Sequence, residues 1–349
     1  MSCCAPFLTS KPNPKWFREF RKDLPSMVGK TVAITGCTTG TGRVCAKVCA
    51  ELGAKVMMLN RDSARADAAF LEVCSVAEKA GAPKPMKVSC DLLSFSSVRQ
   101  AAESVCAHLA SEGLDILCNN AGIMGHRDEV TVDGFDIQMQ TNHLSHFLLT
   151  SELFHMLEKA ASLRGDARIV NHSSLAKDLD GKLLDGKFFE PHEAGSLGGD
   201  VEAGMMKGPR FHRYQQSKLA NVVFTYALDT RLRKAGSKVK ALCAHPGVAP
   251  TELGPSMMKN TGMSMNPCIG CVFAMLFMQS VEDATMGILR GCCDPSAKSK
   301  DFYGPVGKGL MGMKGKADLL PEDPVADADG EALLWTASCN ATKCSFDIC

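Results

Sequence analysis

Short apolar runs alternate with longer amphipathic segments along most of the chain. From residue 29 onward the runs KTVAITG, KVMMLNR, PMKVSCDL, LDILCNNAG, ARIVNHSS and KVKALCAHPG predict six strands, and the segments between them predict helices. Each run is apolar on both faces, as expected for strands that helices cover on both sides. This alternation predicts right-handed βαβ units and a doubly wound, mostly parallel α/β sheet of the Rossmann type.

The pattern changes in three places. Residues 1–28 read as an N-terminal extension with one short helix between Pro14 and Pro25. Residues 175–213 are rich in glycine and charged residues and interrupt the alternation, so we expect an inserted loop there before a helix that starts at Arg213.

The pattern is weaker after residue 255. SVEDATMGILRGCCD predicts a helix, KDFYGP a seventh strand and GEALLWTASCNATK a last short helix. We therefore expect one domain of about seven strands over 29–340, with 341–349 as a C-terminal tail. The segment 134–160 (GFDIQMQTNHLSHFLLTSELFHMLEKA) reads as one long helix.

Composition narrows the class of protein. The chain has 349 residues, a formal net charge of +1, 22% charged and 45% hydrophobic residues, which fits one large globular domain with extensions. Near-neutral charge argues against a nucleic-acid partner held through phosphate contacts. No apolar run reaches the roughly 18 residues that a membrane-spanning helix needs. The run CIGCVFAMLFM (268–278) leaves peripheral membrane contact open.

Seventeen cysteines are scattered along the chain, several of them inside predicted helices and strands, where they act as small apolar residues. The opening MSCCAPFLTS lacks the apolar core of a signal peptide, so we expect reduced thiols in the cytosol or an organelle stroma. Cys268 and Cys271 form an isolated C-x-x-C, which we interpret as apolar filler. Cys3 and Cys4 could also carry acyl chains, but we favour unmodified thiols there.

The stretch TGCTTGTG holds Gly36, Gly40 and Gly42 between a predicted strand and a predicted helix. Glycine allows positive φ and close approach of a ligand to the backbone, and the N-terminus of the following helix favours an anion. This context favours a pyrophosphate site. The spacing differs from G-x-G-x-x-G, so a glycine-rich turn without a ligand remains the alternative.

Further polar motifs follow in order. They are CNNAG (118–122), TNHLSHF with Asn142, Ser174 at the end of the fifth strand, the Y-x-x-x-K of Tyr214 and Lys218, and HPGVAPTEL (245–253). Most lie at the carboxyl ends of predicted strands or on helices that leave them, which is the edge where such sheets bind ligands.

Together these motifs resemble the short-chain dehydrogenase/reductase family over about residues 28–255, with a weaker match to near 340. RIVNHSSLA and QSKLANVVF are most similar to the retinol-dehydrogenase-type branch, whose members act on lipophilic alcohols and carbonyls. The resemblance implies a hydride transfer between a nicotinamide and the substrate carbon, with Tyr214 handling the proton on oxygen.

The expected acid–base group combines four side chains. Tyr214 and Lys218 share one helix face, and a lysine ammonium beside a phenol of pKa about 10 favours the phenolate. The resemblance implies that Ser174 orients the substrate oxygen, with Ser173 as the alternative, and that Asn142 holds a water that links Lys218 to solvent.

The end of the second strand indicates the cofactor. NAD-binding proteins commonly carry a carboxylate there, whereas this chain has Asn60 and Arg61, and an arginine can hold a 2′-phosphate bidentately. Thr38 adds a hydroxyl contact. We therefore favour NADP(H) over NAD(H). Asp62 argues the other way, but we expect it to cap the next helix.

None of the nine histidines shows metal-ligand spacing, so no metal is expected. The resemblance does imply further contacts to the cofactor. Three residues depart from the usual pattern: Thr41, Ser145 and His172. Besides Tyr214 and Lys218, the expected cofactor-binding residues are Gly36, Thr38, Gly40, Thr41, Gly42, Arg61, Asp91, Leu92, Asn119, Ala121, Gly122, Val248 and Thr251.

Two other functions stay open. Protochlorophyllide-reductase-like C=C reduction also uses Y-x-x-x-K and an insert, although this insert does not resemble theirs. A non-catalytic NADP(H)-binding protein on the same fold is the second, and the intact Ser174, Tyr214 and Lys218 argue against it. The substrate is expected to be a lipophilic small molecule, and the sequence leaves the oligomeric state open.

Overall fold

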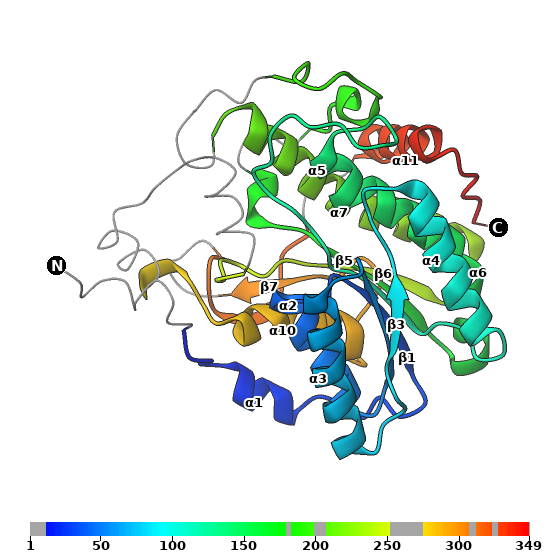
Figure 1. Cartoon of the computed structure of the whole chain (residues 1–349), viewed down its shortest axis with the longest axis vertical. Coiled ribbons are helices and arrows are strands. Elements are labelled where there is room, and N and C mark those ends of the chain that lie inside the picture. The colour runs from blue at the N-terminus through cyan, green and yellow to red at the C-terminus, as the bar shows by residue number, and fades with distance from the viewer. Residues whose placement is uncertain are drawn as a thin grey trace.

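One eight-stranded sheet forms the centre of the molecule, and helices cover both of its faces (Figure 1). The computed structural model describes residues 12–178, 183–198, 207–251, 275–306, 312–322 and 327–348. The sequence run 268–274, Cys3, Cys4, Cys268 and Cys271 lie outside the described residues.

The strand order is β3-β2-β1-β4-β5-β6-β7-β8, and every neighbouring pair is parallel except β7 with β8. The chain runs outward from β1 to β3 and then returns beside β1, so the topology reverses between β1 and β4. Ligands bind at the carboxyl edge near such a point. The strands are β1 Thr31–Thr35, β2 Lys55–Asn60, β3 Met86–Ser89, β4 Ile116–Asn119, β5 Ala167–His172, β6 Val239–Ala244, β7 Phe302–Val306 and β8 Lys316–Leu319.

The Rossmann-type fold predicted from the sequence is confirmed, with one strand more than the expected seven. The additional strand, β8, pairs antiparallel with β7 at the edge of the sheet. Only Ala317 of its four residues is buried. So short and exposed a strand carries no readable apolar pattern.

The helices form two layers. On one face α2 (Gly40–Glu51), α3 (Ala64–Ala80), α10 (Val281–Cys293) and α1 (Phe17–Lys22) pack on the sheet. On the other face lie α4 (Phe95–Leu109), α6 (Ser145–Arg164), α7 (Pro209–Ala235) and α11 (Ala328–Thr342) (Figure 1). Alternate residues of β1 contribute to the two cores, which is why the strand is apolar throughout. No described helix combines the length and apolarity required to cross a bilayer.

The expected single helix over 134–160 is in fact interrupted. Residues Ile137–Met139 form α5, Gln140–Leu144 form a π-helical turn (η1), and α6 follows from Ser145. Such single π turns are frequent at functional sites. Apolar periodicity does not reveal this turn, because all five of its residues are buried whatever their polarity.

The inserted loop contains two short 3₁₀ turns, and the helix after it starts earlier than expected. Residues Leu175–Asp178 (η2) and Gly186–Phe189 (η3) form 3₁₀ turns, and α7 starts at Pro209 rather than at Arg213. A proline is well suited to the first turn of a helix, where its missing N–H has no partner to lose.

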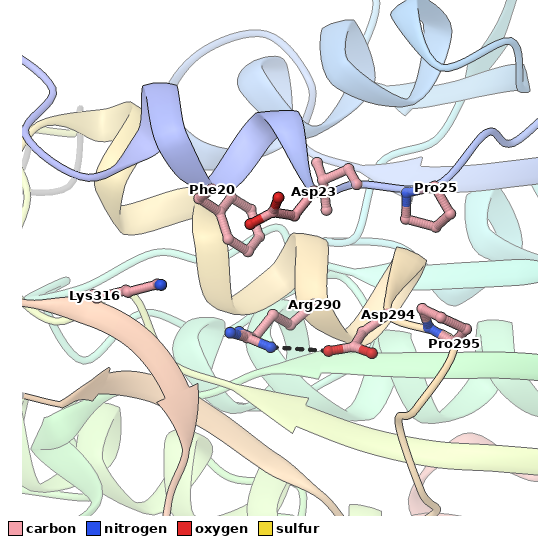
Figure 2. A pocket seen from close by; sticks show the side chains of 8 residues that line it. Phe20, Asp23, Pro25, Arg290, Asp294, Pro295 and Lys316 are labelled. Carbon is pink, nitrogen blue, oxygen red and sulfur yellow. Dashed lines mark hydrogen bonds and ion pairs between the residues drawn. The ribbon is translucent and has the colours of Figure 1, made fainter.

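The N-terminal segment is tied to α10. Backbone N–H groups of Lys15, Trp16 and Phe17 donate to the carboxylate of Asp283 at 2.8–2.9 Å. Below α1 a small pocket of about 130 Å³ is lined by Phe20, Pro25, Arg290 and their neighbours (Figure 2). None of the expected site residues lines this pocket.

Candidate functional site

The glycine loop between β1 and α2 needs its three glycines for backbone conformation or for close packing. Gly36 and Gly40 have φ of +72° and +61°, and a Cβ on Gly36 would lie 2.9 Å from the Cα of Ala121. A Cβ on Gly42 would lie 2.3 Å from both the Gly36 carbonyl oxygen and Nδ2 of Asn120. The N-cap residue Thr39 makes no side-chain hydrogen bond to the first turn of α2, which leaves the N–H groups there suited to an anion.

Asn120 joins this loop to β4. Its Nδ2 donates to the Thr35 carbonyl at 2.9 Å, and its Oδ1 accepts from Thr41 at 2.8 Å. The Thr35 hydroxyl in turn accepts from the Asn120 and Ala121 N–H groups, both at 3.0 Å. The unusual Thr41 is therefore part of a hydrogen-bond network that holds the loop.

Asn119, expected at the cofactor ribose, points its side chain into the protein. Its Nδ2 donates to Thr150 at 3.1 Å and to Asn171 at 2.9 Å, and the residue is 1% exposed. Sequence reasoning expected Asn119 at the cofactor ribose and did not single out Asn120, whose side chain faces the glycine loop. Because neighbouring residues of a strand point to opposite faces, only the register of β4 separates the two.

Ser174, Tyr214 and Lys218 converge at the carboxyl end of β5. The Tyr214 phenol is buried and lies beside the Ser174 hydroxyl. Burial raises the pKa of Tyr214, and the neighbouring Ser174 hydroxyl only partly offsets this. Ser173 faces away, because its hydroxyl donates to the Lys218 carbonyl at 2.7 Å.

The Lys218 side chain is oriented by the backbone around it. Its Nζ donates to the His172 carbonyl at 3.0 Å, and a Cβ on Gly122 would lie 3.1 Å from that Nζ. Burial lowers the pKa of Lys218 to about 8. The expected effect of the ammonium on the phenol is not among the causes that set the pKa of Tyr214 here, which are burial and Ser174.

Asn142 lies in the π-helical turn and connects two elements. Its Oδ1 accepts from the Ile123 N–H at 2.8 Å, and its Nδ2 donates to the Ile123 carbonyl at 3.0 Å and to Ser217 at 2.9 Å. The side chain thus holds the segment after Gly122 against α7, next to Lys218.

Three buried histidines surround this region. Burial lowers the pKa of His146 to about 4 and of His172 and His245 to about 3, so all three are neutral near pH 7. His146 contacts the Thr35 hydroxyl at 2.9 Å, whereas His143 contacts Ser338. The two do not converge on one point.

At the end of β2 the two charged residues behave differently. Arg61 is exposed and forms no hydrogen bond or ion pair with any described residue. Asp62 accepts a hydrogen bond from Ser89 at 2.7 Å and lies 3.3 Å from Nζ of Lys87. The expectation that Asp62 caps α3 is wrong, because the Ser63 hydroxyl accepts from the Ala66 N–H in that role.

The other expected cofactor residues line the same edge of the sheet. Asp91 Oδ1 accepts from the Leu93 N–H at 3.0 Å, and the Leu92 carbonyl accepts from Ser145, which explains that departure from the usual glycine. A Cβ on Gly40 would lie 3.4 Å from Thr251 Cγ2, so residue 251 borders the glycine loop. Thr38 is half-buried in the turn, and Val248 donates its N–H to the Met313 carbonyl at 2.7 Å.

Residues 30–183 match the family model described as short chain dehydrogenase. Mouse retinol dehydrogenase 13 is 34% identical over 319 residues, which cover 89% of this chain and 83% of that protein. The chain belongs to the short-chain dehydrogenase family. Human retinol dehydrogenase 14 is 35% identical over 324 residues, which cover 89% of this chain and 86% of that protein.

These similarities confirm the retinol-dehydrogenase-like branch that the motifs predicted. A solved structure of an uncharacterized protein from Mycobacterium paratuberculosis is 31% identical, with a TM-score of 0.69, and covers 93% of this chain and 98% of that one. The protein is therefore an oxidoreductase by family, and family membership supports a nicotinamide cofactor.

The inserted loop of this short-chain dehydrogenase is anchored beside Tyr214. Arg213, fully buried, lies 3.0 Å from the Asp136 carboxylate and donates to the Gly198 carbonyl at 3.0 Å. The N–H of Leu197 donates to Asp128 at 2.8 Å, and His192 is 3.3 Å from the same carboxylate. Buried charges therefore fix the described part of the insert to the loop that follows β4.

Proposed function

We propose that this chain is an NADP(H)-dependent oxidoreductase that interconverts an alcohol and a carbonyl on a lipophilic small molecule. The observation that carries the proposal is that the buried Tyr214 phenol lies beside the Ser174 hydroxyl, one helical turn from Lys218. The retinol dehydrogenases to which the chain is similar support the lipophilic substrate class.

The glycine loop fits a dinucleotide. The positive φ of Gly36 and Gly40 and the uncapped start of α2 suit a pyrophosphate, which residues 36–42 would hold. Thr251, which lies beside Gly40, and Val248 would border the nicotinamide amide. When bound, the nicotinamide supplies or accepts the hydride.

Charge at the end of β2 supports NADP(H) over NAD(H). Arg61 is exposed and has no ion-pair partner among the described residues, so it is free to bind a 2′-phosphate. The Asp62 carboxylate is paired with Lys87, which lessens its repulsion of that phosphate. Asn60 uses its Oδ1 to accept from the Cys37 N–H at 2.6 Å and thereby orders the loop.

The acid–base chemistry follows from the environment of Tyr214. Because burial raises the pKa of its phenol, the group is protonated at neutral pH and can donate a proton to a carbonyl oxygen as that oxygen gains charge. Ser174 would hydrogen-bond the same oxygen. The Lys218 ammonium would stabilise the phenolate left behind, and Asn142 keeps Lys218 and the segment after Gly122 in position. The water linked through Asn142 stays a prediction.

The direct test is turnover of retinal, a steroid ketone and an aliphatic aldehyde, followed by NADPH absorbance. Loss of one general acid typically costs about 10²–10⁴-fold, so we expect Tyr214→Phe to lose at least that much rate while it still binds NADPH. Tyr226→Phe is the matched control, because Tyr226 is a buried tyrosine of the same helix. It should retain activity.

Each outcome separates the candidate functions. If Tyr214→Phe keeps most of its activity, the proposed mechanism is wrong. NADPH binding without turnover on any substrate of the panel would favour a non-catalytic binding protein. Pigment reduction that requires light would favour the C=C reductase.

A further inference from the structure

Five cysteines from three elements meet behind the glycine loop. They are Cys45 and Cys49 on α2, Cys118 on β4, and Cys292 and Cys293 on α10, and all five are buried. The sulfur atoms of Cys45, Cys118 and Cys292 all lie within 4.8 Å of one another. Considered one at a time, these residues look like apolar filler, and only the fold brings them together.

The cluster continues toward the N-terminal segment. Cys49 lies beside Cys45 and Cys293, and the Cys293 sulfur lies 3.4 Å from the thioether of Met27. Met27 is buried just before β1. Thiol and thioether sulfurs therefore form a continuous line from Met27 to the group of three.

We propose that Cys45, Cys118 and Cys292 form a three-sulfur binding site for Cu(I). Three sulfurs bound at about 2.3 Å around one ion would lie about 4 Å apart, so the site needs only a small contraction. Its donors are all sulfur, which selects soft cations over magnesium, calcium or manganese. Structural zinc sites use four ligands in a tetrahedron, whereas a site of three sulfurs suits Cu(I).

One cationic side chain is fixed near the site. Arg168 pairs with Asp166 and donates to the carbonyl of Gly291, the residue before Cys292 in the last turn of α10. Each thiol that binds copper through its thiolate releases one proton to solvent, and no electron is transferred, because the ion enters and stays as Cu(I).

Occupancy would connect α10 to α2 and β4, the two elements that adjoin the cofactor loop. Cys45 follows Gly42 by one helical turn, and Cys118 comes directly before Asn119. An ion that binds the folded state and not the unfolded chain stabilises it by mass action. Copper should therefore raise the melting temperature.

The test is an anaerobic titration of Cu(I) against a chromophoric Cu(I) chelator. It uses the full chain with Cys3, Cys4, Cys268, Cys271, Cys339, Cys344 and Cys349 replaced by serine, so that thiols outside the described residues and the partly exposed pair near the C-terminus do not compete. We expect one Cu(I) per chain to be withheld from the chelator, and Zn(II) to bind more weakly. Failure to withhold one Cu(I), or tighter binding of Zn(II), would overturn the proposal.

Substitution then assigns the ligands. Loss of a residue that only supports a metal ligand typically weakens metal binding by about 10–100-fold. Loss of two ligands should cost more, so the double variant Cys45→Ala, Cys292→Ala should weaken Cu(I) binding by more than about 100-fold. The control is Cys74→Ala with Cys106→Ala, two partly exposed cysteines outside the cluster. Equal affinity in the two double variants would refute the assignment.

A measurement on the intact cluster covers the case in which the double variant does not fold. X-ray absorption of the copper-loaded chain with the cluster unchanged should give three sulfur neighbours and no nitrogen or oxygen neighbour. Any nitrogen or oxygen in the first coordination sphere would exclude this all-sulfur site.

Discussion

Gly42→Ala tests whether the close packing of the glycine loop is what prepares it for a cofactor. The new Cβ would lie 2.3 Å from the Gly36 carbonyl oxygen and from Asn120 Nδ2. Ordinary contacts are about 3.5 Å or longer, so roughly 1 Å of movement is needed, and the Gly36 side of the contact is backbone. The movement must therefore open the loop or displace Asn120 from the Thr35 carbonyl.

The opposing energies can be compared. Alanine gains up to about 1 kcal/mol over glycine in a helix. Overpacking costs about 1–3 kcal/mol, and a displaced buried amide costs a further 1–3 kcal/mol. The net loss of unfolding free energy is therefore about 1–6 kcal/mol. Because the damage falls on the loop itself, we expect NADPH affinity to fall at least tenfold.

Gly330→Ala is the matched control, because it lies in the first turn of α11 and its nearest neighbour is only the end of the Asp327 side chain, at 3.0 Å. Denaturant unfolding and a fluorescence titration with NADPH measure both effects. If Gly42→Ala binds NADPH as tightly as the wild type and unfolds at the same denaturant concentration, the packing argument fails.

Three further predictions concern charge. Arg61→Ala should weaken NADPH binding at least tenfold and NADH binding little, with Arg65→Ala as the exposed control, and equal loss for both cofactors would exclude the phosphate contact. Because burial lowers the pKa of Lys218 to about 8, its ammonium is present at pH 7 and lost above pH 8. The kcat/KM for carbonyl reduction should fall through that range, which a profile flat to pH 10 would contradict. Asp136→Asn leaves Arg213 buried without its counter-ion and should cost about 3–5 kcal/mol of unfolding free energy, so an unchanged denaturation midpoint would argue that the pair is dispensable.

The main features of the fold were predictable because they depend on local patterns. Strands buried on both faces are continuously apolar, and the helices between them have their own periodicity, so seven of the eight strands could be predicted. The strand β8 escaped this reasoning, because it is short and only Ala317 is buried. The π-helical turn around Asn142 escaped it too, because a fully buried stretch has no polar face to mark its phase.

The order of motifs along the chain determined the family, the branch and the edge of the sheet where chemistry should be sought. Only the tertiary structure decided which side chains face that edge. Asn120 holds the glycine loop while Asn119 points into the protein, and Asp62 pairs with Lys87 instead of capping α3. Tyr214 lies beside Ser174 in a buried setting that raises its pKa. The physical reason is that strand register, burial and contacts between distant segments depend on how the whole chain packs, whereas a motif records only residue type and spacing.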